Sequence, residues 1–260
     1  MDFREKYRPK RFSEFVGNGD AILLLKNIIK SRDLPTGILI YGPPGSGKTT
    51  LARVFLKGLH CDNFTEDVCG QCDDCRFFDT ETYGAGPCLF SKFSYHDCTA
   101  INKARMDYIL SLLPLDSHLE SKVGRTIHVF DEFHRIKEPL QERLLYHLEK
   151  RPQRLLLIFC AIDMKVIRPE FRQRVTKVPT EVPELDELIP WLQGICDSEG
   201  IVIKGGDVLR QIASSANRLP RECVSFLEKI HLLGKPLTTT LVKELAEDQE
   251  FNGPQYGLAP

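Results

Sequence analysis

The sequence predicts an α/β fold in which a mostly parallel sheet carries helices on both faces and is followed by a small all-α unit. Short apolar segments alternate with amphipathic helices between residues 19 and 160, and this alternation is typical of parallel sheets. The composition changes at 178–183, Val-Pro-Thr-Glu-Val-Pro, which is typical of a hinge. We therefore expect a core domain over 1–179, a helical lid over 180–250 and a flexible tail over 251–260.

Composition restricts the classes of function that are possible. The 260 residues suffice for one large and one small domain, with 42% hydrophobic and 27% charged residues. A net charge of −1 excludes a global basic field, so any contact with DNA must come from a local patch or from several subunits. There is no apolar run long enough for a membrane span and no signal-peptide core at the start. These features predict a cytoplasmic protein with no membrane partner.

The first third of the chain contains its most informative motif. Residues 3–17 are basic and then aromatic, with too little apolar periodicity for a helix, whereas 19–31 are expected to form an amphipathic helix. An apolar strand at 37–41 leads into the pattern G-x-x-x-x-G-K-[ST], and 50–57 are expected to be helical. The residues of the pattern are Gly42, Pro43, Pro44, Gly45, Ser46, Gly47, Lys48 and Thr49.

This pattern, between a strand and a helix, predicts a phosphate-binding loop. Its glycines let backbone N–H groups wrap around phosphates, and the helix N-terminus adds partial positive charge. We expect Lys48 to reach the β- and γ-phosphates, Thr49 to hold Mg²⁺ and Thr50 to lie among the nucleotide contacts. A glycine-rich turn without a ligand is the alternative, which the flanking strand and helix disfavour. The sequence therefore predicts that the protein binds a nucleoside triphosphate.

Four cysteines follow the phosphate-loop helix with the spacing of a metal site. They are Cys61, Cys69, Cys72 and Cys75, and four thiolates can hold Zn²⁺ tetrahedrally. The residues between them are mostly short and polar and cannot bury a core, so we expect a structural zinc module over 61–75. An iron–sulfur cluster and four unrelated thiols are the alternatives.

The sequence in the middle of the chain predicts acidic residues at one edge of the sheet. Residues 76–95 are poorly patterned and contain a turn, and a strand near 90–96 is followed by a helix over 100–113. The apolar strand 126–132 ends in Asp131 and Glu132. Behind a phosphate loop, we expect Asp131 to act through the magnesium shell and Glu132 to orient or deprotonate the attacking water.

The remaining elements complete the sheet and the lid. A helix that contains Leu140, Leu144 and Leu148 precedes a buried strand over 155–160. Three arginines lie within 168–174, either as a solvated surface or as a group that contains an arginine finger. Helices are expected at about 184–199, 206–216 and 220–233 and from 238 onward, and Arg221 follows Pro220 in a first helical turn.

Taken together, these segments resemble an AAA+ ATPase of the clamp-loader group over residues 4–245. The segment Glu-Lys-Tyr-Arg-Pro-Lys at 5–10, followed by Phe-Val-Gly at 15–17, looks like the part with which clamp-loader ATPases enclose adenine. The phosphate loop and Asp131-Glu132 match the ATP site of that group. The four-cysteine insertion is similar to that of bacterial gamma/tau clamp-loader subunits.

The resemblance implies roles for further residues. The nucleotide would be ATP, with Mg²⁺, and its adenine would meet a set of residues near the start of the chain. Arg174 would be the arginine finger, although Gln173 and Val175 flank it where the family has Ser-Arg-Cys. Arg221 would be the lid arginine that touches the γ-phosphate. The adenine contacts would come from Tyr7, Arg8, Pro9, Val16 and Gly17.

The sequence departs from the clamp-loader pattern at two points. The family has a polar sensor after the strand at 155–160, where this chain has Ala161-Ile162-Asp163. This departure bears on hydrolysis more than on binding. A helical collar is expected after the lid but does not follow within 260 residues. Arg172-x-Arg174, Leu219-Pro220-Arg221 and the segment 253–258 also look like parts of the Holliday-junction branch-migration motor.

Three functions follow from these observations. The first is an oligomeric ATPase, in a ring with other AAA+ subunits, that loads a sliding clamp onto primed or double-stranded DNA. Lys103 and Arg105 are candidate phosphate contacts, although exposed basic side chains are usually only solvated. The second is another AAA+ motor, of the branch-migration or transposition type. The third is an ATP-binding scaffold with little turnover.

Overall fold

The chain divides into two compact units. The computed structural model describes residues 2–80, 93–113, 122–150 and 155–252. Pro9–Glu181 form a sheet unit, and Met1–Arg8 with Val182–Pro260 form a helical unit. The sequence-based division had placed the first eight residues with the sheet. The tail expected over 251–260 lies almost entirely outside the described residues.

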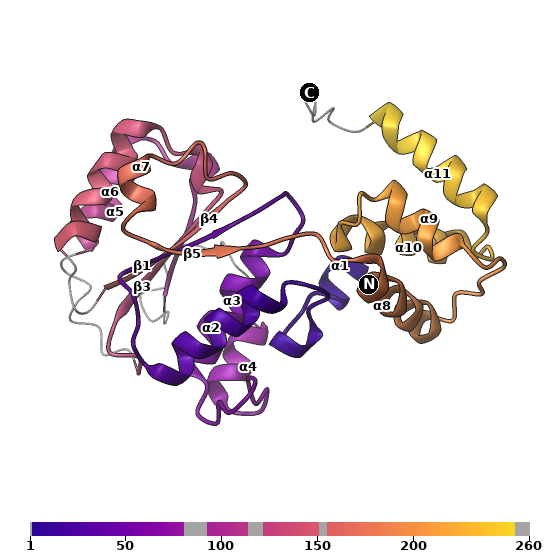
Figure 1. Ribbon diagram of the computed structural model, residues 1–260, viewed down its shortest axis with the longest axis horizontal. Coiled ribbons are helices and arrows are strands. Elements are labelled where there is room, and N and C mark those ends of the chain that lie inside the picture. The colour runs from indigo at the N-terminus through magenta and orange to yellow at the C-terminus, as the bar shows by residue number, and fades with distance from the viewer. Residues whose placement is uncertain (1, 81–92, 114–121, 151–154, 253–260) are drawn as a thin grey trace. The chain divides into compact units, whose positions relative to one another are not determined.

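The sheet unit is built on five parallel strands in the order β2-β3-β4-β1-β5 (Figure 1). The three inner strands are almost completely buried, which explains why their sequences are continuous apolar runs rather than alternating ones. Each strand ends at the same edge of the sheet because all pairings are parallel. The strands are β1 Gly37–Tyr41, β2 Ser94–Asp97, β3 Thr126–Asp131, β4 Leu155–Ala161 and β5 Thr176–Pro179.

Helices cover both faces of this sheet, as the sequence predicts (Figure 1). α2 Gly19–Ser31 and α3 Lys48–His60 pack on one face, where they meet Leu156 and Ile158 of β4. α5 Lys103–Leu112 and α6 Glu138–Lys150 pack on the other, where they meet Leu157. Successive residues of β4 thus enter opposite hydrophobic clusters, as the pleat of a strand requires.

Some local elements differ from the sequence-based expectation. α4 Asp73–Thr80 is a helix at the start of a stretch that was expected to be irregular. The strand expected near 90–96 is described as β2 Ser94–Asp97, and 81–92 lie outside the described residues. The helix expected over 100–113 begins at Lys103, because the Asn102 side chain accepts a hydrogen bond from Arg105 N and caps it. The arginine-rich segment contains the short helix α7 Pro169–Arg172.

The helical unit contains the four helices predicted after the hinge. They are α8 Leu185–Glu199, α9 Val208–Ser215, α10 Pro220–Leu233 and α11 Thr239–Asn252. α8 and α10 both end at a glycine in the left-handed conformation, Gly200 and Gly234.

A short N-terminal helix, α1 Phe3–Lys6, belongs to the helical unit and corrects the prediction that residues 3–17 contain no helix. Asp2 caps it, with Oδ1 accepting from Arg4 N at 2.8 Å. Phe3 is buried, and its ring lies 5.2 Å from that of His231 on α10. One buried side chain and one cap hold this turn, so its sequence shows no apolar periodicity.

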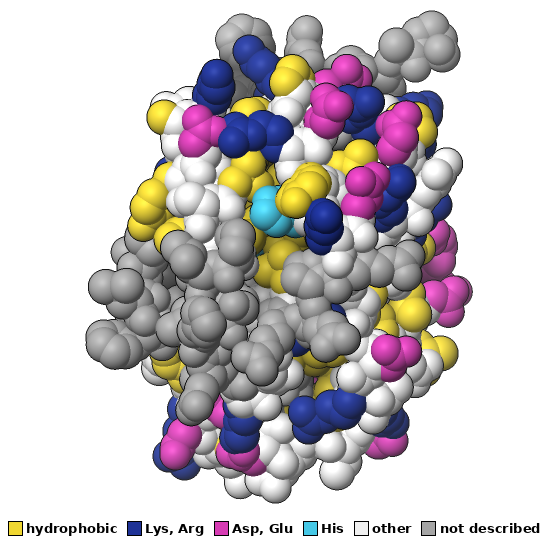
Figure 2. Space-filling view, turned by 90° about the vertical axis from the view of Figure 1, so that its left-hand side faces the viewer, with side chains coloured by type: hydrophobic (Ala, Val, Ile, Leu, Met, Phe, Trp, Pro, Cys, Tyr) yellow, Lys and Arg dark blue, Asp and Glu magenta, His cyan; other side chains and the backbone are white. Residues whose placement is uncertain are grey.

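The surface of the sheet unit has mixed charge on the face that carries α5, α6 and α7. Figure 2 shows basic and acidic side chains interspersed there rather than gathered into one positive field, in keeping with the net charge of −1. Among the described helices, none combines the length and the apolar character that crossing a bilayer requires.

Two histidines are buried side by side in β2 and β3. His96 Nε2 lies 3.0 Å from His128 Nδ1, and the rings stack with centroids 5.3 Å apart. Burial, together with the neighbouring His128 and Arg105, lowers the pKa of His96 to about 3. The folded protein therefore holds His96 neutral.

We predict that His96 makes the folded state sensitive to acid. Its folded-state pKa is depressed below the unfolded value of about 6.5, so its contribution to stability is complete above about pH 6.5 and is lost as the pH falls toward 3. Between pH 7 and pH 5 the free energy of unfolding should fall by about 2 kcal/mol more in the wild type than in His96→Gln. Urea denaturation of both proteins at the two pH values measures this, and equal losses would contradict it.

Candidate nucleotide site and cysteine cluster

The phosphate loop leaves the carboxyl edge of the sheet through a position that only glycine can occupy. Gly42 follows β1 with φ +155°, and a Cβ built on it would lie 2.1 Å from the carbonyl oxygen of Thr180. Gly45 and Gly47 also have positive φ angles, of 76° and 91°. The glycines of the pattern therefore serve backbone geometry that other residues adopt only with strain.

Residues far along the chain hold this loop in place. Ser46 Oγ and Thr180 Oγ1 lie 2.8 Å apart, and Thr180 Oγ1 also donates to the carbonyl oxygen of Tyr41 at 3.1 Å. Asn18 Nδ2 donates to Ser46 O at 3.3 Å, while Asn18 Oδ1 accepts from Glu181 N at 2.8 Å. Sequence reasoning missed Asn18 and Thr180, because no local pattern marks either residue as a partner of the loop.

Lys48 is buried at the start of α3. Its Nζ donates to Gly42 O at 2.9 Å and to Pro43 O at 2.8 Å. Burial lowers the pKa of Lys48, whereas the carboxylates of Glu132 and Asp131 act in the opposite direction. The loop therefore encloses a cation whose hydrogen bonds go to the loop's own carbonyl groups.

Thr49, Asp131 and Tyr95 meet at one carboxylate oxygen. Asp131 Oδ2 accepts from Thr49 Oγ1 at 2.9 Å and from Tyr95 Oη at 2.7 Å. Burial and the charge of Asp131 raise the pKa of Tyr95, so the phenol remains protonated and a donor. The predicted magnesium ligands Thr49 and Asp131 are therefore adjacent, and Tyr95, in β2, is a member of the site that the sequence did not reveal.

Glu132 stands at the turn that follows β3. It adopts the left-handed conformation with φ 53°, which directs the chain into the 3₁₀ turn Phe133–Arg135. Its Oε2 lies 3.3 Å from His134 Nε2, and its side chain is 40% exposed. Burial lowers the pKa of His134, so the imidazole is mainly neutral at pH 7. Glu132 is thus an accessible carboxylate beside the buried Asp131.

The two arginines implied by the family resemblance belong to different units of the chain. Arg174 Nη2 pairs with Glu149 Oε1 at 2.8 Å, and its Nη1 donates to Glu170 O at 2.8 Å. Arg221 is exposed at the start of α10, in the helical unit. The Arg174 guanidinium is therefore engaged by groups other than the phosphate loop.

The position of the expected polar sensor is apolar. Ala161 ends β4 fully buried, and its carbonyl oxygen accepts from Gly42 N at 3.2 Å. Asp163 is exposed, and its Oδ1 accepts from Lys165 N at 2.8 Å in a local turn. Asp163 therefore closes its own turn.

The proposed adenine contacts divide between the two units. Tyr7 donates through its hydroxyl to Glu199, and burial together with this hydrogen bond raises the pKa of Tyr7 to about 12. Arg8 pairs with Glu5 at 3.0 Å. Pro9, Val16 and Gly17 belong to the sheet unit. Val16 and Gly17 lead directly into Asn18, which holds the phosphate loop.

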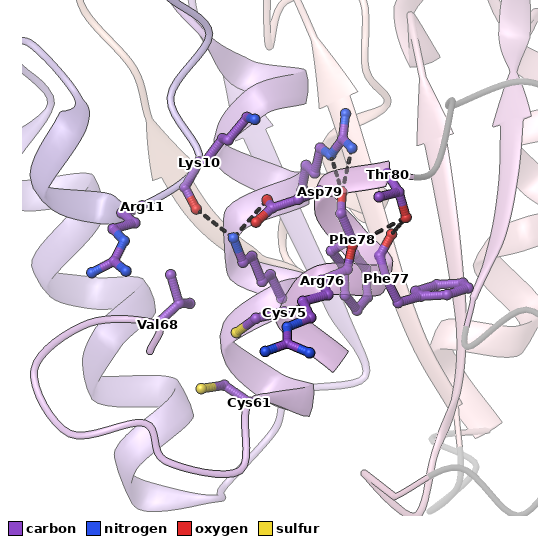
Figure 3. Close-up of polar contacts among 12 residues, drawn as sticks. Lys10, Arg11, Cys61, Val68, Cys75, Arg76, Phe77, Phe78, Asp79 and Thr80 are labelled. Carbon is purple, nitrogen blue, oxygen red and sulfur yellow. Dashed lines mark hydrogen bonds and ion pairs between the residues drawn. The ribbon is translucent and has the colours of Figure 1, made fainter. Parts of the chain in front are cut away.

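The four predicted zinc ligands converge. The Sγ atoms of Cys61, Cys69, Cys72 and Cys75 all lie within 4.8 Å of one another. Those of Cys69 and Cys75 are 3.8 Å apart, close to the edge of about 3.8 Å for a tetrahedron with 2.3 Å Zn–S bonds. The sulfur atoms of Cys61 and Cys75 face the same space, where Val68 also lies (Figure 3).

Backbone amides around the cluster favour thiolates. Cys69 Sγ accepts from the N–H groups of Gln71 and Cys72, each at 3.4 Å, and Cys61 Sγ accepts from Cys69 N at 3.3 Å. The amides of Gln71 and Cys72 lower the pKa of Cys69 to about 6. Burial raises the pKa of Cys61 and of Cys75, so a metal ion would be what holds these two sulfurs as thiolates. Four converging sulfur ligands fit a structural Zn²⁺ site, in which the metal would neutralise the thiolates and hold the loop together.

The parallel sheet, the phosphate loop after β1 and the acidic pair after β3 define a P-loop protein of the AAA+ class. Comparison with known families gives a narrower placement. The family model described as DNA polymerase III, delta subunit, matches residues 17–181, more than half of the chain. The chain belongs to this family.

Relatives with curated names extend the similarity to most of the chain but are themselves longer. The chain is 29% identical over 248 residues to protein STICHEL of Arabidopsis thaliana, covering 94% of this chain and 19% of that protein. It is 27% identical over 237 residues to DNA polymerase III subunit gamma/tau of Mycoplasma pneumoniae, covering 91% of this chain and 33% of that protein. Among solved structures, a variant of Thermotoga maritima RuvB matches with a TM-score of 0.66 at 18% identity, covering 95% of this chain and 74% of that chain. The chain thus spans one fifth to one third of the length of these curated relatives, and the RuvB match shows the fold alone.

We predict that the purified protein retains one zinc ion that Cys72 helps to bind. Cys72→Ala removes one of four ligands, so the metal should be lost on dialysis against EDTA and the melting temperature should fall. Cys98→Ala, which changes a buried cysteine outside the cluster, should keep the metal. Plasma mass spectrometry measures the zinc content of both variants. Equal retention of zinc by both would contradict the assignment of Cys72 as a ligand.

Proposed function

We propose that this chain is the ATP-binding and ATP-hydrolysing subunit of a DNA sliding-clamp loader. One observation carries the proposal: Thr49 and Asp131 share a hydrogen bond beside the buried Lys48, in a chain whose family is described as DNA polymerase III, delta subunit. The gamma/tau subunits of DNA polymerase III are similar over nine tenths of this chain. Their name makes those proteins subunits of a DNA polymerase.

The site is arranged to hold Mg²⁺-ATP. Lys48 exchanges its contacts with Gly42 O and Pro43 O for phosphate oxygens, which are stronger acceptors because they carry charge. Thr49 and Asp131 are the residues that hold Mg²⁺, which neutralises developing charge on the phosphates. Glu132, accessible and next to Asp131, orients the attacking water.

A neighbouring subunit completes the site in this proposal. Arg174 is the side chain that would reach a neighbour's γ-phosphate, and it must first leave Glu149 and Glu170 O. Arg221 would contribute from the helical unit of the same chain. The ring would therefore contain further AAA+ subunits, of the same or of different sequence.

DNA contact is assigned to a local patch, because the chain as a whole is not basic. Lys103 and Arg105 are exposed in the first turn of α5. The guanidinium of Arg105 lies 5.2 Å from the ring centroid of Tyr108, which gives it a defined direction. These residues would contact the phosphates of primed or double-stranded DNA, and the sliding clamp would bind elsewhere on the assembly.

One observation favours a second function, an ATP-binding scaffold with little turnover. The polar sensor position is occupied by the buried Ala161, and Asp163 is engaged in its own turn. Such a protein binds ATP but positions the attacking water poorly. Another AAA+ motor is the third candidate function. The fold of this chain matches that of RuvB, and one solved RuvB is described as a Holliday junction branch migration motor.

ATP hydrolysis in three conditions separates these functions: protein alone, with primed DNA, and with primed DNA plus a sliding clamp. A clamp loader should be stimulated most by DNA and clamp together. Stimulation by DNA alone would favour another motor. Tight ATP binding without turnover in all three conditions would favour the ATP-binding scaffold.

We predict that Lys48→Ala abolishes the ATP-dependent function without unfolding the protein. Loss of the only cation in the loop should lower turnover by about 100-fold or more, because preorganised charges at the phosphates supply catalysis of that order. Lys57→Ala is not a suitable control, because Lys57 is buried and paired. Lys243→Ala, at an exposed lysine of α11, is the control. ATP affinity and turnover unchanged in Lys48→Ala would contradict the site.

We predict that Tyr95→Phe weakens the response to magnesium specifically. Removing the hydroxyl leaves Asp131 Oδ2 without its 2.7 Å donor, and loss of such an outer partner typically costs about 10-fold in metal affinity. The Mg²⁺ concentration for half-maximal ATP binding should rise, while ATP affinity in EDTA should not change. Tyr108→Phe, at an exposed tyrosine, should leave both quantities unchanged.

A further inference from the structure

Residues 10–18, here called the arm, connect the cysteine cluster to the phosphate loop. The arm contains the 3₁₀ turn Phe12–Glu14 and precedes α2. At one end it contacts residues 61–75, here called the cysteine loop, and at the other it contacts Ser46 and Gly47. Both sets of contacts lie within the sheet unit.

Asp67 binds the arm to the cysteine loop through backbone hydrogen bonds. Asp67 Oδ1 accepts from Phe12 N at 3.0 Å, and Oδ2 accepts from Ser13 N at 2.8 Å. The same Oδ1 accepts from Val68 N at 2.7 Å, which fixes the carboxylate within its own loop. One side chain therefore satisfies two backbone donors of the arm.

Arg11 makes the reciprocal contact. Its Nη2 donates to Cys69 O at 3.0 Å, the carbonyl oxygen of a metal-ligand residue. A Cβ at Gly70 would lie 2.4 Å from the same nitrogen, so the guanidinium is packed closely against the cysteine loop. The position of Arg11 therefore depends directly on the conformation around Cys69.

Buried groups anchor the same end of the arm. Phe12 is 2% exposed, and its ring meets that of Phe64 of the cysteine loop edge to face at 6.4 Å. Lys57 Nζ donates to Lys10 O at 3.1 Å and to Asp79 Oδ1 at 2.6 Å, as the dashed lines at Lys10 and Asp79 in Figure 3 show. The arm is thus fixed to the cysteine loop, to α3 and to α4.

The other end of the arm supports the phosphate loop. The Phe15 ring lies 3.5 Å from the position of a Cβ at Gly47. Asn18 donates to Ser46 O and accepts from Glu181 N. A shift of the arm therefore moves the backbone that is expected to wrap around the phosphates.

The cysteine loop has little besides its thiols to hold its own shape. Its buried apolar residues are Cys61, Val68 and Cys75, against which Phe64, Cys69 and Cys72 pack. A metal ion joining four of these six side chains replaces the hydrophobic core that the loop lacks.

We propose that the metal ion at the cysteine cluster acts as a positioning element for the nucleotide site, through Asp67, Arg11 and the arm. This rests on the proposed binding of ATP at the phosphate loop. Metal binding orders the cysteine loop, the loop holds Phe12 and Ser13, and the far end of the arm holds the phosphate loop ready. Because such coupling is reciprocal, ATP also tightens retention of the metal.

The test compares ATP affinity of zinc-loaded and zinc-stripped protein in the wild type, Asp67→Ala and Glu66→Ala. Glu66 is the matched control, since it is exposed and pairs with Lys30 rather than with the arm. Stripping zinc should weaken ATP binding of the wild type and of Glu66→Ala by about 5-fold or more. Asp67→Ala should keep its zinc, bind ATP as weakly as the stripped wild type, and show no further loss on stripping.

Hydrogen exchange provides a readout that is independent of ATP. The amides of Phe12 and Ser13 should be protected in the zinc-loaded wild type and exchange rapidly after stripping or in Asp67→Ala. The amides of Ile158 and Phe159 in β4 should stay protected throughout, which shows that the sheet remains folded.

Three results would overturn the proposal. If removal of zinc leaves the ATP affinity of the wild type unchanged, the metal is not coupled to the nucleotide site. Equal losses in the wild type and Asp67→Ala show that the coupling bypasses Asp67. Unchanged protection of Phe12 and Ser13 shows that the metal does not order the arm. If the zinc-loaded wild type binds no ATP, the proposed function fails instead, and hydrogen exchange still decides whether the metal orders the arm.

Discussion

The hydrogen bond from Thr49 to Asp131 is the interaction on which the candidate site depends. It joins the start of α3 to the end of β3, across 82 positions of sequence, at 2.9 Å. A parallel sheet makes it possible, because β1 and β3 end at the same edge with β4 between them. Lys48, Thr49, Asp131 and Glu132 lie at this edge, whereas Arg174 precedes β5 and pairs with Glu149.

The same edge imposes limits on the backbone around it. Gly42 passes so close to Thr180 that no side chain fits, and Ser46 reaches the same threonine. The loop is therefore held from outside by Thr180, which follows β5, and by Asn18. Such support orders the loop before a ligand binds, so binding does not have to provide the free energy of ordering it. In our proposal, the cysteine cluster acts on the site through this external support.

Local sequence patterns were sufficient for part of the fold and site. The phosphate loop, the acidic pair and the four cysteines were predictable because each lies within one short segment whose spacing is set by its chemistry. The central strands and long helices were predictable because burial on one or both faces leaves a periodic trace. Thr180, Asn18 and Tyr95 were not predictable, because their partners lie 134, 28 and 36 residues away and only the tertiary fold brings them together. The short helix α1 escaped prediction because one cap and one buried ring fix it without any periodicity.

The central claim is that the sheet unit binds ATP with Mg²⁺ at Lys48, Thr49 and Asp131. Isothermal titration of the chain with a non-hydrolysable ATP analogue, with Mg²⁺ and then with EDTA, tests it most directly. The account predicts binding of one nucleotide per chain that weakens markedly when Mg²⁺ is removed. Absence of binding in both conditions, or binding indifferent to Mg²⁺, would contradict it.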